Sequence, residues 1–223
     1  MPYRYNNFHL LVKKNLTFGA FFLILLIMTN ILIATHNKNK LKEFQTLLEL
    51  LGFHVLCADD VGLPDVNETG TTFRENSALK AMAAAQFANM PVLADDSGLC
   101  VHALNNEPGL YSARYATQNG GYPAVFDVLL GRLKDDYSAH FECCLCLAKP
   151  GAEPLFFEGQ VFGHLVKTPD TTFSSFGYDP IFMPDGYDKT FGGLPSEVKN
   201  KISHRANAIK KLLAYLEKNK DFT

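Results

Sequence analysis

From residue 31 onward, short apolar runs typical of buried strands alternate with segments of helical periodicity. ILIA (31–34) predicts a strand, and apolar residues at 41, 44, 47, 48 and 51 then mark one helix face that ends at Gly52. FHVLCA (53–58) and PVLA (91–94) predict two further strands. Between them, Thr72 and Glu75 form a capping box for a helix that reaches Ala88. This alternation predicts an α/β protein whose sheet begins with parallel strands.

The second half of the chain predicts antiparallel additions to that sheet. Residues 122–134 have a helical pattern, and FECCLCLAK (141–149) and PLFFEGQVFGHLV (154–166) predict a long hairpin. SHRANAIKKLLAYLEK (203–218) predicts a closing amphipathic helix. The expected fold class is therefore α/β with a mixed sheet.

Composition narrows the kind of protein. The 223 residues are 47% hydrophobic and 20% charged, which suits one sizeable domain or two lobes that share a core. A net charge of -2 gives no overall field for a nucleic-acid backbone, so nucleic acid is not an expected partner. The five cysteines lack zinc-ribbon spacing, and we interpret them as buried reduced thiols of a cytoplasmic protein.

Residues 1–30 form a hydrophobic N-terminal extension that differs from the rest. Lys13 and Lys14 precede an apolar run over residues 16–28, which would suit a signal peptide or a membrane anchor. The run is shorter than the roughly 20 residues of a membrane span, and Met28 directly precedes the domain-like pattern. We favour Met28 as the true start, with the domain at 31–223 and membrane contact only if residues 1–30 are retained.

Two adjacent carboxylates, Asp95 and Asp96, follow the apolar run PVLA at the point where the predicted strand stops. Like charges in a poorly solvated place repel, so positive charge is expected nearby. One or two carboxylates together with substrate phosphates are the ligands that magnesium uses, and this is the functional interpretation. The alternative is that one aspartate caps a turn before Ser97 and Gly98.

The turn THNKNK (35–40) lies between the first predicted strand and helix. A helix N-terminus presents free N–H groups and positive dipole, so a turn with these lysines and asparagines could hold phosphates. The glycines of a phosphate-binding loop are missing, and an ordinary solvated turn is the alternative. Further candidates have structural alternatives of the same kind: Arg114 as a surface charge, Phe176 as a core aromatic and His204 as a turn residue.

Six ordered motifs resemble those of the inosine triphosphate pyrophosphatases: THNKNK, ETGTTFRENSALKA, ADDSGL, PGLYSARYA, FGYDPIFMPDG and SHRANA. The resemblance covers Ile31 to Leu216. It implies an elongated two-lobed fold around a long central mixed sheet, with the cleft between the lobes. It also implies a homodimeric, Mg²⁺-dependent enzyme that hydrolyses ITP, dITP and XTP to the monophosphate and pyrophosphate, which cleanses the nucleotide pool.

The resemblance assigns roles to individual residues. Asp96 matches the catalytic acid that also binds the metal, and Glu68 matches a second metal ligand. The phosphate-binding and nearby contacts would be Thr35, His36, Asn37, Lys38, Asn39, Lys40, Lys80, Ser97 and Arg114. The purine pocket would be formed by Phe176, Gly177, Tyr178, Asp179, Lys199, His204 and Arg205. The chain departs from the family pattern at His36, where glycine is frequent, and at Asn67, which is often acidic.

Selection among purine bases would depend on the hydrogen-bonding groups along the edge of the base. Hypoxanthine and xanthine carry a 6-keto oxygen and a ring N–H, so a donor such as Arg205 and a matching acceptor would leave adenine with unpaired buried groups. Three rival interpretations remain. A membrane-tethered protein whose function lies in its anchor would require residues 1–30 in the mature chain. A pyrophosphatase of the septum-inhibitor type would prefer modified pyrimidines, against which the SHR and FGYD motifs argue. A non-enzymatic nucleotide sensor would lack metal carboxylates, whereas Glu68, Asp95 and Asp96 are present.

Overall fold

A six-stranded mixed sheet forms the centre of the computed structural model, which describes residues 30–49 and 52–219. The strand order is β2-β1-β3-β4-β5-β6. β1 runs parallel to β2 and β3, and the remaining neighbours are antiparallel, which confirms the predicted parallel start and antiparallel hairpin. β6 was not predicted. The strands are β1 (Asn30–Ile33), β2 (His54–Cys57), β3 (Val92–Val101), β4 (Ser138–Ala148), β5 (Leu155–Leu165) and β6 (Phe182–Pro184).

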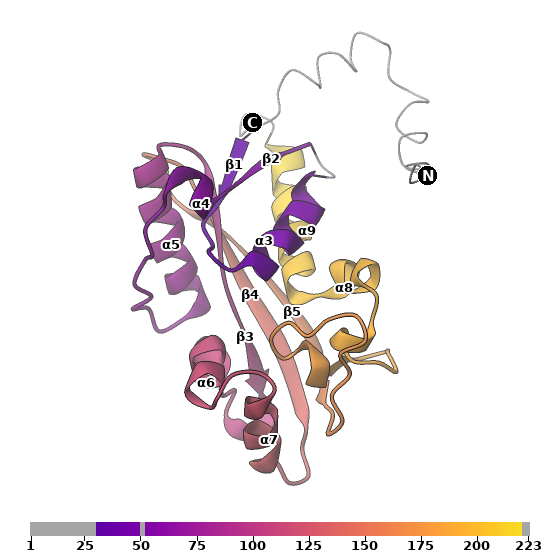
Figure 1. Cartoon of the computed structure of the whole chain (residues 1–223). Coiled ribbons are helices and arrows are strands. Elements are labelled where there is room, and N and C mark those ends of the chain that lie inside the picture. Colours follow the sequence, from indigo (N-terminus) through magenta and orange to yellow (C-terminus); the bar gives the residue numbers. More distant parts are fainter. Residues whose placement is uncertain (1–29, 50–51, 220–223) are drawn as a thin grey trace, which may run out of the picture.

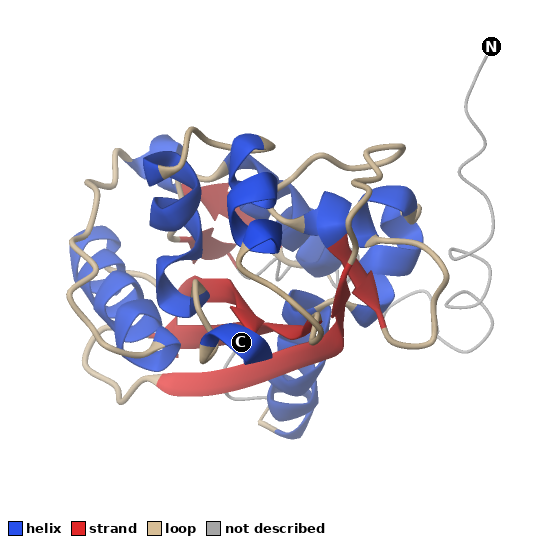
Figure 2. Cartoon of the chain, turned by 90° about the horizontal axis from the view of Figure 1, so that it is seen from below, coloured by secondary structure: helices blue, strands red, loops and turns tan. Residues whose placement is uncertain are grey.

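Helices pack on both faces of this sheet, and α6 and α7 lie at the far end of its long strands (Figures 1 and 2). α5 contacts β3 and β4, whereas α9 contacts β4 and β5. The α-helices are α3 (Lys38–Leu48), α4 (Ala58–Val61), α5 (Phe73–Ala88), α6 (Ser112–Gln118), α7 (Ala124–Gly131), α8 (Ser196–Ile202) and α9 (His204–Lys218). Short 3₁₀ turns complete the chain: η2 (His102–Leu104), η3 (Gly109–Tyr111), η4 (Asp179–Ile181) and η5 (Phe191–Gly193).

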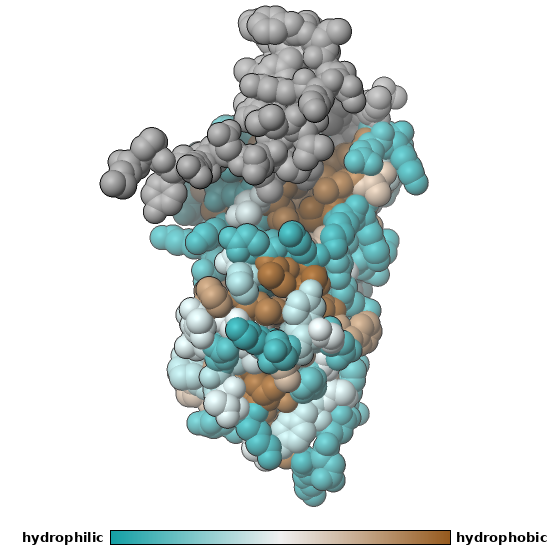
Figure 3. Space-filling model, turned by 90° about the vertical axis from the view of Figure 1, so that its right-hand side faces the viewer, coloured by the Kyte–Doolittle hydropathy of each residue, from teal (hydrophilic) through white to brown (hydrophobic). Residues whose placement is uncertain are grey.

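The buried apolar residues form separate clusters, which explains the elongated two-lobed shape. One cluster joins β1 to α3 and α9 through residues such as Phe44 and Leu212, and a second joins the other face of the sheet to α5. A third surrounds Phe141 and Phe182 at the far end of the long strands. Removal of this apolar surface from water is the main stabilising term of both lobes. On the face shown in Figure 3, hydrophobic residues lie in groups among hydrophilic ones.

Most predicted elements are confirmed within a few residues. Thr72 caps α5 by accepting a hydrogen bond from the Glu75 N–H at 3.1 Å, as the motif predicts. The reciprocal bond is displaced by one residue, because the Glu75 carboxylate accepts from the N–H of Thr71 at 2.6 Å. The predicted helix over 122–134 is shorter, since Pro123 is the N-cap of α7 and the helix ends at Gly131.

The prediction that a strand stops at the aspartate pair is wrong. β3 continues to Val101, with Asp95 opposite Leu145 and Asp96 opposite Cys144. β4 therefore supplies backbone hydrogen-bond partners for the polar part of β3. Successive side chains of a strand point to opposite faces, so the two carboxylates are separated rather than placed together.

The prediction of reduced cysteines is confirmed, whereas the prediction about the N-terminal extension is not tested. All five cysteines are free, and all are buried except Cys57, which is partly exposed. Burial raises the pKa of Cys146 to about 12, so this thiol is inert at neutral pH.

The extension and its Met28 start lie outside the described residues, apart from Asn30 at the start of β1. Within the described part of the chain, no helix has the length and apolar character of a membrane span.

Candidate active site

A polar cleft of about 300 Å³ lies where β1, α3, α5, β3 and α9 approach the loops of the far lobe. Every residue that the sequence predicts for the site lines this cleft except Lys38, Asn39 and Asp95 of the aspartate pair. Lys38 is exposed, and Asn39 lines an adjoining cavity beside Lys42 and Ser174. The predicted residues in the cleft are Thr35, His36, Asn37, Lys40, Glu68, Lys80, Asp96, Ser97, Arg114, Phe176, Gly177, Tyr178, Asp179, Lys199, His204 and Arg205.

Asp95 is a buried anion held by two cations. Its carboxylate lies 3.0 Å from Lys40 Nζ and 2.9 Å from Arg205 Nη2, and it accepts a hydrogen bond from Ser97 Oγ at 3.0 Å. Burial opposes the charged form, but Lys40 and Arg205 outweigh it and hold the pKa of Asp95 well below its usual range. Asp95 therefore joins α3 to α9 on one face of the sheet.

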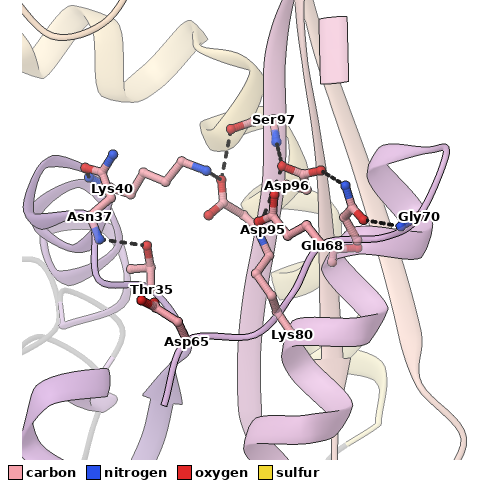
Figure 4. A network of polar contacts seen from close by, with 12 residues as sticks. Thr35, Asn37, Lys40, Asp65, Glu68, Gly70, Lys80, Asp95, Asp96 and Ser97 are labelled. Atoms are coloured by element: carbon pink, nitrogen blue, oxygen red, sulfur yellow. Dashed lines mark hydrogen bonds and ion pairs between the residues drawn. The ribbon is translucent and has the colours of Figure 1, made fainter. Parts of the chain in front are cut away.

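Asp96 lies on the opposite face, toward α5 (Figure 4). It accepts hydrogen bonds from Asn76 Nδ2 at 3.1 Å and from the Ser97 N–H at 3.0 Å, while Lys80 Nζ lies 3.8 Å away. Burial raises the pKa of Asp96 to about 6, against the lowering effects of Lys80 and Lys40. This carboxylate is less compensated than Asp95, which suits a group that binds a further cation or accepts a proton.

Glu68 completes an acidic group beside Asp96. Lys80 Nζ lies 2.5 Å from Glu68 Oε1 and so bridges the two carboxylates, while Arg114 donates to the Glu68 backbone oxygen at 3.1 Å. Two hard oxygen donors around a position close to a lysine ammonium fit magnesium, which prefers one or two carboxylates plus phosphate and water. Asn67 adds no charge, so the donor set consists of Glu68 and Asp96.

The first turn is organised by its own side chains. Asn37 caps α3 by accepting from the N–H groups of Asn39 and Lys40, and Thr35 Oγ1 accepts from the Asn37 N–H at 3.2 Å. These bonds occupy N–H groups that a helix N-terminus would otherwise offer to an anion. Anion binding by this turn would therefore depend on Lys40 and the helix dipole. His36 pairs with Asp59 at 3.2 Å and Asp65 at 3.4 Å on the exposed rim.

A buried ionic network forms the other end of the cleft. Lys199 Nζ lies 2.5 Å from Asp179 and 2.8 Å from Glu43, and Arg205 pairs with both Glu43 and Asp95. Burial raises the pKa of Asp179 although Lys199 opposes that effect. Burial, with Arg205 and Lys199 beside it, holds the pKa of His204 well below its usual value, so this imidazole is neutral.

Several polar atoms at this end have no partner in the described part of the chain. Arg205 Nε, His204 Nδ1 and Asp95 Oδ1 are buried and make no hydrogen bond. The His204 ring is stacked on Phe141, with the ring centroids 4.8 Å apart. Buried polar groups are normally satisfied, so unpaired polar atoms beside a cleft are candidate contacts for a ligand. Gly177 has φ of +59°, a conformation that favours glycine, and so orients the segment between Phe176 and Asp179.

Sequence reasoning missed two residues that hold the site together. Glu43 lies one turn after Lys40 on α3. This i, i+3 spacing places the two side chains on the same helix face and could have identified Glu43 as a site residue. Asn76 is buried, accepts from the Gly70 N–H at 2.8 Å and donates to Asp96. The i, i+4 spacing from Asn76 to Lys80 on the predicted helix places both side chains on one face and could have identified Asn76.

The fold and cleft define a two-lobed α/β protein that places acidic and basic side chains around an interlobe cleft. The Ham1 family model matches residues 31–215, so the chain belongs to the Ham1 family. The chain is 43% identical over 198 residues to a dITP/XTP pyrophosphatase of Bacillus subtilis, which covers 86% of this chain and all of that protein. It is 42% identical over 199 residues to a dITP/XTP pyrophosphatase of Brucella melitensis, covering 81% of this chain and 90% of that protein.

Solved structures agree with this assignment. The Ham1 protein of Staphylococcus aureus superposes with a TM-score of 0.75 at 42% identity, covering 86% of this chain and 100% of that chain. A nucleoside-triphosphatase / dITP/XTP pyrophosphatase of Mycobacterium abscessus gives a TM-score of 0.66 at 36% identity, covering 84% and 100%. The expected α/β fold with its long mixed sheet is therefore confirmed.

Proposed function

We propose that this protein hydrolyses the non-canonical purine nucleoside triphosphates ITP, dITP and XTP to the nucleoside monophosphate and pyrophosphate. The observation that carries the proposal is the pair Asp95 and Asp96. Asp95 is neutralised by the fixed cations Lys40 and Arg205, and Asp96 lies beside Glu68 with its pKa raised to about 6 by burial. Membership of a family with relatives named dITP/XTP pyrophosphatase supports the substrate class.

Asp96 and Glu68 would hold Mg²⁺. When bound, that ion would supply charge neutralisation for the triphosphate and acidify a bound water. Asn76 and the Ser97 N–H orient the Asp96 carboxylate, which would accept the proton of the attacking water. A pKa of about 6 leaves Asp96 ionised at neutral pH, as a general base requires.

The phosphates would lie among Lys40, Lys80 and Arg114, near the turn from Thr35 to Asn37. Cleavage between the α and β phosphates makes pyrophosphate the leaving group, and these cations would stabilise its growing charge. Lys38 and Asn39 lie outside the cleft and would act only through the turn. Ser97, which contacts Asp95, would approach the nucleotide from β3.

The purine would stack on Phe176 and present its edge to the ionic network. The unpaired Arg205 Nε is suited to donate to a 6-keto oxygen, and the neutral His204 offers an unpaired ring nitrogen. Adenine, with an amino group at that position, would leave these groups unsatisfied, which costs a few kcal/mol. Asp179 and Lys199 would orient the pocket through their mutual ion pair.

The resemblance also supports a homodimer in the cytoplasm, and the buried reduced thiols agree with a reducing compartment. Size-exclusion chromatography with light scattering would test the dimer.

A panel of nucleoside triphosphates tests the function, with Mg²⁺ present and pyrophosphate release as the readout. We expect kcat/KM for ITP, dITP and XTP at least ~100-fold above that for ATP. Preference for dTTP or UTP would favour the septum-inhibitor type, and orthophosphate as first product would contradict the proposal. Nucleotide binding without turnover would favour a sensor.

A further inference from the structure

A second group of ligating side chains lies on β3 and β4, away from the cleft. Cys100 and His140 are directly opposite partners in the antiparallel ladder, and Glu142 follows His140 by two residues. Their side chains therefore leave the sheet on one face. The Cys100 sulfur, a His140 ring nitrogen and a Glu142 carboxylate oxygen lie within 4.8 Å of one another. Cys100 and His140 are buried, and Glu142 is partly exposed, which leaves a route from solvent.

A chain of hydrogen bonds orients these side chains. His140 Nδ1 lies 2.9 Å from His102 Nε2, and His102 Nδ1 lies 2.9 Å from Ser138 Oγ. His140 Nε2 is thereby left facing Glu142 Oε2 at 3.5 Å. Gln160 fixes the carboxylate by donating to the same oxygen at 2.8 Å. Partners that hold the second ring nitrogen of a histidine and the oxygen of a carboxylate are the outer shell that metal ligands require.

The charge of this group is not balanced by protein cations. Within the described residues, the ion pair of Glu142 is with His140, whereas Glu68, Asp95 and Asp96 each contact a lysine or an arginine. A divalent cation would supply the missing positive charge. One sulfur, one imidazole and one carboxylate favour zinc over magnesium, which prefers oxygen alone.

The geometry points to a site for Zn²⁺ or a similar transition-metal ion at Cys100, His140 and Glu142, and we propose it as a metal site separate from the cleft. Tetrahedral ligands about 2.0–2.3 Å from zinc are about 3.5 Å apart, so small side-chain rotations would close the group. The Cys100 thiol gives its proton to solvent as the sulfur–metal bond forms. His102 positions His140, and the fourth ligand is water.

The site is separated from the catalytic carboxylates along β3. Cys100 follows Asp96 by four residues on the same face, about 13 Å at the usual strand rise of about 3.3 Å. Gly98 lies between them, and the Gly109 backbone oxygen is only 2.1 Å from where a Gly98 Cβ would stand. η3 therefore packs on the sheet between Asp96 and Cys100, next to Glu142, which is opposite Gly98 in the ladder. A metal here would cross-link β3 to β4 rather than take part in hydrolysis.

Titration of the chelator-treated full chain with Co²⁺, without magnesium, tests the site. We expect one bound ion per chain to give a sulfur-to-cobalt charge-transfer band and tetrahedral visible bands, with Zn²⁺ displacing Co²⁺ and raising the melting temperature. Cobalt at Glu68 and Asp96 would have no sulfur ligand and no such band, so Asp96→Asn should retain the signal. Absence of the charge-transfer band at saturating Co²⁺ would overturn the proposal.

Variants assign the ligands. Cys100→Ser should abolish the charge-transfer band, and the matched control Cys57→Ser should keep it. Glu142→Gln, which changes a partly exposed side chain, and His102→Ala, which changes an exposed one, should weaken Co²⁺ binding by about tenfold or more. These two variants keep the test valid if Cys100→Ser fails to fold. Loss of the band in Cys57→Ser, or unchanged affinity in both Glu142→Gln and His102→Ala, would contradict the site.

Discussion

Asp95 and Asp96 are adjacent in sequence, yet their carboxylates lie on opposite faces of β3. Asp95 faces Lys40 and Arg205, and Asp96 faces Asn76 and Lys80. The strand thus separates a structural anion from a chemically available one. Substitution of each aspartate should therefore have a different consequence.

Asparagine at each position tests this separation. Asp96→Asn should lower kcat/KM for ITP by about a hundredfold or more, because metal and proton acceptor are both impaired. Its melting temperature at pH 7 should stay equal or rise, since burial disfavours the Asp96 charge. Asp95→Asn should lower the melting temperature by leaving Lys40 and Arg205 undercompensated. Calorimetry and steady-state kinetics on both variants would measure this, and near-native turnover by Asp96→Asn would reassign the base.

The pH dependence of kcat/KM should reflect the ionisation of Asp96. Its pKa of about 6 exceeds the ordinary value of about 3.9, so the folded protein holds the proton more tightly than the unfolded chain. Stability from this group is present at low pH and declines as pH rises through roughly 4 to 6. The ionised form is needed for turnover, so kcat/KM should rise with a midpoint at about pH 6 and level about one pH unit above it.

Added magnesium favours the carboxylate, so the midpoint of this rise should move to lower pH as the Mg²⁺ concentration increases. Initial rates at subsaturating ITP over several Mg²⁺ concentrations would measure the shift. Asp96→Asn is the control, since its residual activity should lose the ascending limb.

Lys40 and Arg205 share the Asp95 carboxylate but are proposed to contact different parts of the substrate, so their substitutions should affect specificity differently. Lys40 is proposed to contact phosphates, so Lys40→Ala should lower kcat/KM for ITP and ATP by similar factors. Arg205→Lys keeps a charge for Glu43 and Asp95 but loses the Nε donor, so ITP turnover should fall at least ~10-fold while ATP turnover changes little. Equal losses for both nucleotides in Arg205→Lys would make Arg205 a structural residue.

Glu43 should matter for stability. It is the shared partner of Lys199 and Arg205, and removal of one member of a buried ion pair costs about 3–5 kcal/mol. Glu43→Ala should approach that loss in denaturant unfolding, and Glu43→Gln should lose less because its amide oxygen still accepts a hydrogen bond. Glu49→Ala, a change at the exposed end of α3, is the control. A loss below ~1 kcal/mol in Glu43→Ala would show that water replaces the carboxylate.

Local patterns predicted much of this molecule because they report local physics. Alternation and capping residues identified β1, α5, the β4–β5 hairpin and α9, and ordered motifs identified residues that line one cleft. Thr35 and Arg205 are far apart in sequence but line the same cleft, because the N-terminal ends of α3 and α9 both lie beside β3.

The remainder depended on pairings that no local pattern encodes. The polar sequence after Ala94 resembles a turn, and only the β4 ladder makes it a strand. Glu43 and Arg205 are far apart in sequence, so their contact requires α3 and α9 to pack on the same face of the sheet.

The short parallel contact between β1 and β3 has a consequence for how a ligand is held. β1 pairs with β3 only at Val92 and Leu93, and the chain then turns away at Thr35. From Asp95 to Gly98, the edge of β3 that faces away from β4 therefore has no strand neighbour in the described residues, and the cleft lies there. A nucleotide in the cleft would lie where a longer β1 would continue beside β3. It would therefore shield this unpaired sheet edge from other chains.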